Sequence, residues 1–137
     1  PEAANVDTAL EEDPLKVLEA DGTELKFVPK KFMIFNGPFD YTNLTYHMQI
    51  TNVSKYPVAY MLKSTSIPRI TALPPRGVLQ PGTSVDIAVT MQAFNGEPNF
   101  KDRICFEYKR TDSETFSMEE MHNAARRRKN IRVLYNE

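Results

Sequence analysis

The sequence of 137 residues contains one cysteine, two histidines and five glycines, and these scarcities narrow its possible functions. Because Cys105 has no partner in the chain, an internal disulfide and a cysteine-based zinc site are excluded, and a reducing compartment is favoured. His47 and His122 leave little material for acid–base or nucleophilic catalysis. The few glycines form neither a phosphate-binding loop nor a dinucleotide fingerprint. These absences predict a non-enzymatic domain that holds no metal and no cofactor.

Long apolar runs are also absent. No segment approaches the roughly 18 consecutive apolar residues that a transmembrane helix needs, so we expect no membrane span. The N-terminus, PEAANVDTALEEDP, lacks the basic and then apolar order of a secretory signal. With 41% hydrophobic and 10% aromatic residues, the chain is nevertheless able to bury one core. We therefore expect one soluble, cytoplasmic domain with a tail.

Negative charge is concentrated at one end of the chain. Residues 1–24 carry eight acids and one base, a net charge of −7, whereas residues 25–137 carry ten acids and sixteen bases, a net charge of +6. This asymmetry predicts an acidic arm, partly extended or an edge strand, followed by a basic domain over residues 25–137. The arm is either a passive solvated terminus or an interaction segment. Its candidate contact residues are Glu11, Glu12, Asp13 and Glu19.

The strongest pattern present is a period-two alternation of apolar and polar residues. Such alternation is typical of strands with one buried and one solvated face. Prolines and glycines separate the alternating segments and indicate turns between them. Short strands at this spacing, without intervening helices, predict an antiparallel β-sandwich. The alternating segments are residues 43–51, 58–62, 85–91, 104–108 and 131–135.

The phase of the alternation also predicts which side chains are buried. Tyr60, Ile87, Val89 and Phe106 fall on inward positions of facing sheets and are expected in the core. One segment departs from the strand pattern, because Ser117 and the acids that follow it form a capping box. That motif predicts a short helix over residues 118–126, before the last strand.

Several blocks of the sequence, in the same order, resemble the domain of the major sperm protein (MSP) family. The blocks match the opening strand and its turn, the next strand, the proline turn and the C-terminal segments of that domain, and the C-terminal ones look like the nematode sperm branch in particular. The resemblance extends from about residue 25 to the C-terminus. The matching blocks are residues 32–40, 43–54, 74–79, 81–82, 102–104, 127–131 and 135–136.

The resemblance implies a seven-stranded immunoglobulin-like β-sandwich and two alternative functions. Nematode major sperm proteins are cytoskeletal: they form symmetric dimers that polymerise, without bound nucleotide, into filaments that drive sperm crawling. The membrane-tethered relatives, the VAMP-associated proteins, bind short peptides with two phenylalanines in an acidic tract (FFAT peptides). The C-terminal blocks favour a filament subunit or a filament accessory protein of the sperm pseudopod, with itself or MSP filaments as partner and a homodimer as the basic unit. The alternative is a soluble adaptor for acidic FFAT-like peptides.

The peptide-binding face of the tethered relatives uses two lysines, a threonine pair and a hydrophobic contact on adjacent strands. Met61 stands at the position of one lysine and Cys105 at that of the hydrophobic contact, so two positions differ in kind from the family pattern. Loss of one ion pair costs on the order of 1 kcal/mol or more, so this face implies a modified or weaker peptide site. The corresponding residues, all but Ser64 expected to point outward, are Met61, Lys63, Ser64, Thr65, Arg103 and Cys105.

Two charged segments have alternative interpretations. The acidic arm loosely resembles an FFAT peptide with aliphatic residues in place of aromatic ones, and residues 15–20 are therefore either an early edge strand or a segment that docks near Lys63 and Arg103. The basic run over residues 126–129 is either a nuclear signal or phosphate-binding patch, or a solvated corner of the fold, and the resemblance favours the corner. Nucleic acid is not expected as a partner, because the aromatic residues fall on inward strand positions.

Overall fold

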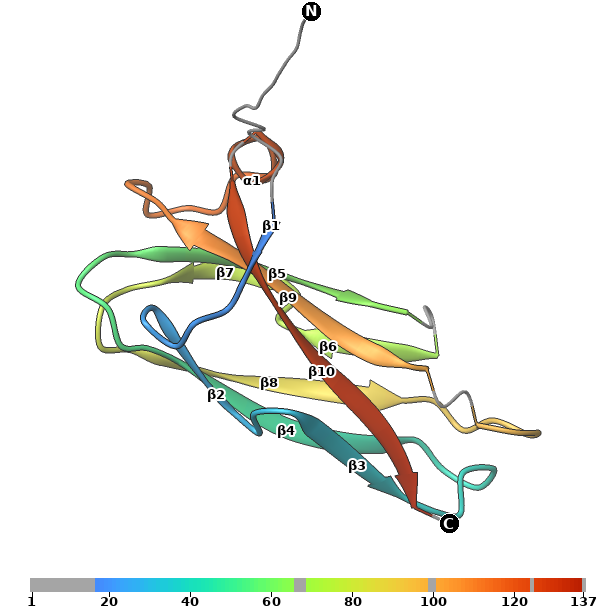
Figure 1. The fold of residues 1–137 in the computed structure, drawn as a ribbon. Helices are drawn as coiled ribbons and strands as arrows, with labels where there is room; N and C mark the ends of the chain where they lie inside the picture. Colours follow the sequence, from blue (N-terminus) through green and yellow to red (C-terminus); the bar gives the residue numbers. More distant parts are fainter. Residues whose placement is uncertain (1–16, 66–68, 99–100, 124, 137) are drawn as a thin grey trace, which may run out of the picture.

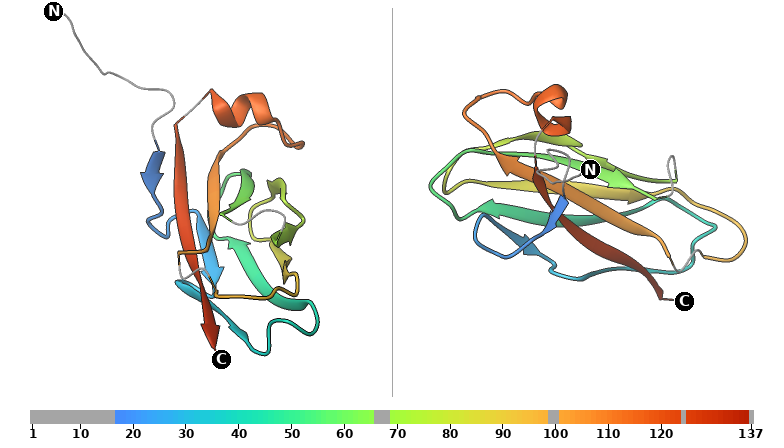
Figure 2. Two further views of the ribbon diagram at one scale, coloured as in Figure 1. Left: turned by 90° about the vertical axis from the view of Figure 1, so that its right-hand side faces the viewer. Right: turned by 45° about the horizontal axis from the view of Figure 1, so that its top comes forward.

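The structure, a computed structural model, describes residues 17–65, 69–98, 101–123 and 125–136, with the backbone alone for Val17 and Glu19. Within these ranges, ten strands and one short helix form two facing β-sheets (Figures 1 and 2). The elements, in chain order, are β1 (Val17–Glu19), β2 (Leu25–Val28), β3 (Phe32–Asn36), β4 (Leu44–Asn52), β5 (Val58–Ser64), β6 (Ile70–Leu73), β7 (Arg76–Leu79), β8 (Ser84–Met91), β9 (Arg103–Arg110), α1 (Met118–His122) and β10 (Arg126–Asn136).

The larger sheet has the order β1-β10-β9-β5-β7, with β3 also paired to β10, and the smaller sheet has the order β2-β4-β8-β6. The predicted β-sandwich is confirmed, but the described residues form ten strands, not seven, and both β1 and β3 run parallel to β10. Two of the three extra strands arise at prolines, which lack an amide hydrogen and interrupt a ladder, and the third is β1 in the N-terminal arm. Pro29 separates β2 from β3, and Pro74 and Pro75 separate β6 from β7. At each break the chain passes from the smaller sheet to the larger one.

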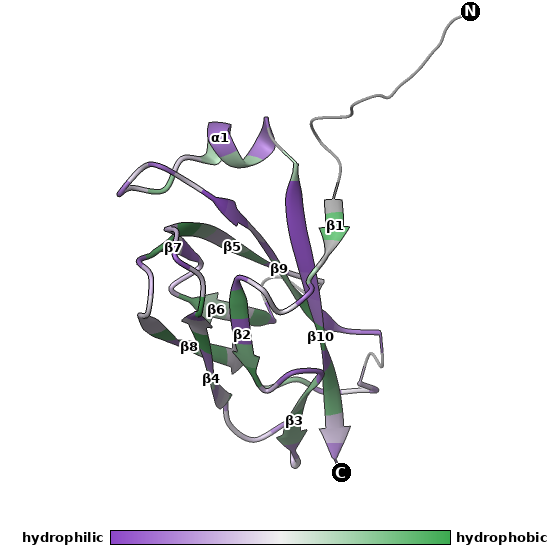
Figure 3. Ribbon diagram, turned by 60° about the vertical axis from the view of Figure 1, so that its left-hand side comes forward, coloured by the Kyte–Doolittle hydropathy of each residue, from purple (hydrophilic) through white to green (hydrophobic). Residues whose placement is uncertain are grey.

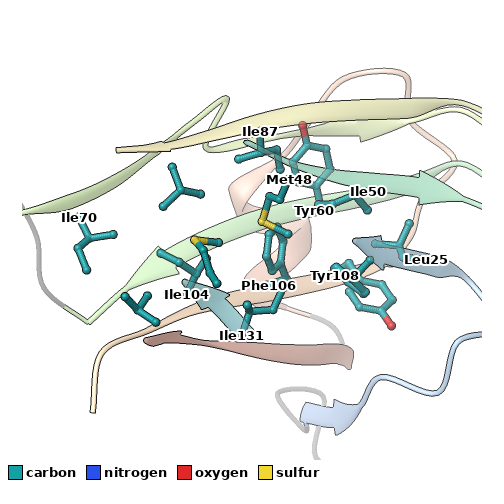
Figure 4. Packing of buried hydrophobic residues seen from close by; sticks show 14 of the residues in the cluster. Leu25, Met48, Ile50, Tyr60, Ile70, Ile87, Ile104, Phe106, Tyr108 and Ile131 are labelled. Carbon is teal, nitrogen blue, oxygen red and sulfur yellow. The ribbon is translucent and has the colours of Figure 1, made fainter. Parts of the chain in front are cut away.

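The core lies between the two sheets (Figure 4). The four residues predicted to be buried, Tyr60, Ile87, Val89 and Phe106, are all buried, so the predicted inward phase is confirmed. Aromatic side chains bridge the layers: the ring of Phe27 on β2 lies 5.2 Å from that of Phe106 on β9, centroid to centroid. Alternating apolar side chains thus fix how the two sheets face each other.

The helix α1 begins as predicted but ends earlier than predicted. Ser117 is its N-cap, and its side-chain oxygen accepts a hydrogen bond from the backbone N–H of Glu120 at 3.2 Å. The helix ends at His122, not at Arg126, because Arg126 already belongs to β10. The Arg126 side chain reaches back and donates a hydrogen bond to the carbonyl oxygen of Met121 at 3.3 Å. No helix in the described part of the chain is long and apolar enough to cross a membrane.

Candidate functional site

Five of the six residues predicted for a peptide-binding face line one groove on the outer face of the larger sheet. The groove has a volume of about 180 Å³ and lies over β5, β9 and the first half of β10. Strand register explains the convergence, because Cys105 on β9 lies opposite Lys63 on β5 and opposite Asn130 on β10. We call this feature the β9 groove; its lining residues are Lys63, Ser64, Thr65, Arg103, Cys105, Glu107, Arg128 and Asn130.

Met61 does not line the β9 groove. It faces outward from the sheet, but its exposed fraction is only 3%, because Met121 of α1 packs over it together with Ala59. Met61 therefore points outward, as predicted, but it is covered by α1 and is not available to a peptide. Alternation gives the direction of a side chain, whereas exposure on the outer face depends on what lies above it.

The centre of the β9 groove is a buried carboxylate that sequence analysis missed. Glu107 is 0% exposed although it lies on the outer face of β9. Its Oε1 lies 2.7 Å from Nε of Arg126 and 3.5 Å from Nζ of Lys63, and its Oε2 lies 2.7 Å from Nη2 of Arg128. Three cations from β5 and β10 thus converge on one acid of β9.

These contacts determine the charge of the β9 groove. Burial alone raises the pKa of Glu107, but the hydrogen bonds from Arg128 and Arg126 and the charges of Arg126 and Lys63 outweigh it and lower the pKa to about 2. Glu107 is therefore ionised at neutral pH. Among the residues that line the groove, Lys63, Arg103 and Arg128 outnumber this single carboxylate, so the groove keeps a net positive charge.

A second buried acid, Asp102, holds one end of the β9 groove. Its carboxylate accepts hydrogen bonds from Arg69 at 2.6 Å, from Thr65 at 3.1 Å and from the hydroxyl of Tyr135. Burial, followed by this hydrogen bond, raises the pKa of Tyr135. The Arg69 guanidinium also lies over the ring of Phe94, 4.6 Å from its centroid. Thr65 is thus fixed by the fold, and its hydroxyl also accepts a hydrogen bond from the backbone N–H of Arg103 at 3.0 Å.

Cys105 and the two histidines show no features of a catalytic site. Burial raises the pKa of the Cys105 thiol, and the nearby charges of Arg128 and Lys63 do not reverse that shift. A thiol with a raised pKa is a poor nucleophile at neutral pH. His47 and His122 are exposed. In the described ranges no three His, Cys, Asp or Glu side chains are grouped so that they could hold a metal ion.

The basic run over residues 126–129 is largely occupied by ion pairs within the fold. Arg126 and Arg128 bind Glu107, whereas Arg127 points to the other side of β10 and binds Asp21 at 3.0 Å and Glu24 at 3.5 Å. The run is therefore not an exposed patch. It is also not the fully solvated corner that the sequence favoured, because its arginines form ion pairs within the fold. The period-two spacing of strands was the sequence signal for this ion-pair cluster. Glu107 follows Cys105 by two positions and therefore shares its outer face, and Arg126 and Arg128 are also two positions apart and share one face of their strand.

The structure describes the acidic arm from residue 17 onward. Glu11, Glu12 and Asp13 lie outside the described residues. The backbone of Glu19 belongs to β1, the strand that pairs with the start of β10, where Glu19 lies opposite Arg128. The segment nearest the domain therefore lies along β10, next to the basic run.

Comparison with known proteins places this geometry in a class. The solved structure of WR4, a C. elegans MSP family member, matches with a TM-score of 0.65 at 16% identity, over 82% of this chain and 98% of that one. The YadV chaperone matches with a TM-score of 0.59 at 12% identity, over 83% of this chain and 52% of that one. At such identities the two matches show the fold alone. The molecule is therefore an immunoglobulin-like β-sandwich of the MSP type.

Sequence comparison defines the family. A family model described as the MSP (major sperm protein) domain matches residues 24–130. Major sperm protein isoform alpha of Ascaris suum is 34% identical over 114 residues, which cover 79% of this chain and 89% of that protein. Major sperm protein 3 of Globodera rostochiensis is 32% identical over 119 residues, which cover 82% and 94%. The chain belongs to the MSP domain family.

Proposed function

We propose that this chain is a non-enzymatic, self-associating protein of the nematode sperm cytoskeleton, either a filament subunit or a filament accessory protein. Its similarity to major sperm proteins over most of its length supports this proposal. Self-association also requires a surface that two copies can share, and the outer side of β3 offers one.

The observation that carries the proposal is the exposed apolar side of β3. Phe32 and Ile34 are 45% and 48% exposed, whereas Met33 and Phe35, which alternate with them, are buried in the core. Exposed apolar side chains gathered on one strand are a common feature of protein interfaces. Ile34 lies opposite Leu134 of β10 in the strand register, which extends the apolar surface across the two strands. Figure 3 shows β3 and the end of β10 side by side.

This surface suits a symmetric dimer. In a two-fold contact each copy presents the same residues, so Phe32 and Ile34 of both copies would meet around the axis. A stable dimer buries about 800 Å² on each partner, so the contact would extend beyond these two residues to neighbouring parts of β3 and β10. A second contact between different surfaces, one that does not close, would turn such dimers into a filament.

Sedimentation velocity over a range of concentrations tests the dimer. The wild-type chain is expected to associate. The double variant Phe32→Thr/Ile34→Thr introduces a residue that is common in strands and is expected to remain monomeric. A matched control replaces two exposed apolar residues elsewhere, Tyr41 and Leu73, with Thr and is expected to associate as the wild type does. Equal association of the β3 variant and the wild type would rule out this surface.

The second candidate function is an adaptor for acidic FFAT-like peptides, favoured by the net positive charge of the β9 groove. Lys63, Arg103 and Thr65 lie together there. Two features weaken this candidate: Met61 is covered, and Lys63 already forms an ion pair with Glu107. Fluorescence anisotropy with a labelled acidic peptide containing two phenylalanines tests it. Lys63→Glu should weaken binding, and Lys55→Glu, at an exposed lysine outside the groove, should not. An adaptor would also stay monomeric in the sedimentation experiment.

A further inference from the structure

A second basic depression lies at the lateral edge of the sandwich, between the β1–β2 loop, β2 and the first half of β10, elements that Figure 3 shows together. Its volume is about 370 Å³. Its apolar surface comes from Ala20, Leu25, Phe27 and Val53, and its charged surface comes from three lysines. We call it the lysine pocket; the lysines are Lys26, Lys30 and Lys129.

The lysine pocket differs from the β9 groove in how its cations are neutralised. In the groove, Glu107 binds Lys63 and Arg128. The lysine pocket has no acidic residue in its lining. Among the described residues, none of its three lysines forms an ion pair or a side-chain hydrogen bond. Uncompensated ammonium groups beside apolar surface fit an anionic ligand that also carries apolar side chains.

We propose that the lysine pocket binds the acidic arm of a second copy of this chain, through residues 10–15 (LEEDPL). This segment places Glu11, Glu12 and Asp13 between two leucines, so it matches both the charged and the apolar surface of the pocket. The part of the arm that precedes β1, residues 1–16, carries five acids and one base. Its net charge of −4 is opposite in sign to that of the three lysines and attracts them.

Chain direction favours the arm of another copy over the arm of the same chain. β1 begins at Val17 and leads directly to Ala20, which lines the lysine pocket. At about 3.3 Å per residue, Val17 lies roughly 10 Å from Ala20, and the chain approaches the pocket along β1. To place Glu12 in its own pocket, the arm would have to turn back alongside β1. The arm of a neighbour has no such constraint.

The contact would join unlike surfaces, an arm from one copy and a pocket from the next. Such a contact repeats from molecule to molecule without closing, unlike the symmetric dimer proposed for β3. It neither requires nor excludes that dimer. Ion pairs at exposed lysines are individually weak and are screened by salt, so the association should be present at low salt and should fall at physiological salt.

A mixing experiment with full-length chains tests the proposal. All proteins carry Phe32→Thr and Ile34→Thr, so that the β3 dimer does not contribute to sedimentation. One variant has a neutral arm (Glu11→Gln/Glu12→Gln/Asp13→Asn) and an intact pocket, and the other has a reversed pocket (Lys26→Glu/Lys30→Glu) and an intact arm. At low salt the parent should associate, each variant alone should be monomeric, and an equimolar mixture of the two should form complexes.

The outcomes separate the possible mechanisms. If the mixture stays monomeric, or if the parent itself does not associate at low salt, arm exchange between copies is ruled out. If the neutral-arm variant associates as well as the parent, the arm is not the ligand. None of these results depends on whether the β3 surface forms a dimer, since that surface is altered in every sample.

A peptide titration locates the site. A labelled peptide of residues 8–16 should bind the neutral-arm chain, and Lys26→Glu/Lys30→Glu should weaken that binding by about tenfold, the loss expected for two exposed ion pairs. The matched control is Lys31→Glu/Lys55→Glu, which reverses two exposed lysines outside the pocket. Equal losses in both variants would mean general charge attraction and would overturn the proposal. The milder pair Lys26→Gln/Lys30→Gln, with a thermal melt, guards against a loss that comes from unfolding.

Discussion

Phe106 and Glu107 are neighbours in β9, and each is 0% exposed, yet the two side chains are buried on opposite faces of the same strand. Phe106 points inward and packs between the two sheets, where its neighbours are apolar. Glu107 points outward and is enclosed by cations from β5 and β10. One strand thus takes part in two buried environments of opposite chemistry.

The difference lies in what compensates burial on each face. Removal of apolar surface from water stabilises the inner face, and this contribution needs no particular partner. A buried carboxylate is costly unless ion pairs and hydrogen bonds replace its water, so the outer face depends on Arg126 and Arg128. The inner face should therefore tolerate changes of pH, whereas the outer face should not. Four predictions test this contrast.

The largest effect is expected on the inner face. Phe106→Ala should lower the free energy of unfolding by about 3–5 kcal/mol, because it removes apolar burial and leaves a cavity between the sheets. Urea denaturation followed by circular dichroism measures the loss. A change below about 1 kcal/mol would mean that the space collapses or that the ring contributes little to the core.

A smaller but substantial effect is expected on the outer face. Glu107→Gln keeps the shape of the side chain and removes its charge, so Arg126 and Arg128 lose their ion pairs with this carboxylate. Breaking a fully buried pair costs about 3–5 kcal/mol, and because Arg128 is partly exposed we expect about 2–3 kcal/mol. Glu114→Gln, at an exposed loop residue, is the matched control and should cost less than about 0.5 kcal/mol. Equal losses in the two variants would show that the ion pairs of Glu107 with Lys63, Arg126 and Arg128 are not stabilising.

The pH dependence of stability should distinguish the faces further. The pKa of Glu107 is lowered from 4.5 to about 2 in the folded chain, so the folded state binds its proton less readily than the unfolded state does. Its stabilising contribution is complete above pH 4.5 and is lost as the pH falls from there through about 2. Unfolding free energies measured across this range should fall more steeply for the wild type than for Glu107→Gln. Phe106→Ala should keep the slope of the wild type, and a shared slope for all three proteins would contradict the assignment.

Sequence alone was enough to predict the inner face. Period-two alternation predicted the orientation of Tyr60, Ile87, Val89 and Phe106, because on a strand between two sheets the inward direction also means burial. It also predicted the β-sandwich. It did not predict ten strands, since a proline turn shows where a ladder stops but not that the chain then pairs in the other sheet.

The outer face was less predictable, because there the direction of a side chain does not determine whether it is buried. Alternation correctly predicted outward directions for Lys63, Arg103 and Cys105, which converge on the β9 groove through strand register. Outward does not mean exposed, however, and α1 covers Met61. The two arginine partners of Glu107 come from a strand some twenty residues later in the chain, and Lys63 comes from an earlier strand. The register of β9 with β10 and with β5 determines which cations reach it, and a single sequence does not specify those registers.

The smallest effect is expected at Lys63, the most exposed of the three cations that contact Glu107. The question there is whether the side chain stabilises the fold or is available to a ligand. Lys63 is 52% exposed and its Nζ lies 3.5 Å from Glu107, whereas the side chain of Arg126 is 11% exposed and its Nε lies 2.7 Å away. Exposed ion pairs contribute about 0–1 kcal/mol, so Lys63→Gln should change the free energy of unfolding by less than about 1 kcal/mol, and Arg126→Gln should cost more. Both are measured by urea denaturation.

If Lys63→Gln proved as costly as Arg126→Gln, Lys63 would be a structural partner of Glu107 and not a residue available to an acidic ligand. If it is nearly neutral, as expected, any loss of peptide binding in the same variant can be assigned to the contact itself, because the fold that presents the groove is unchanged.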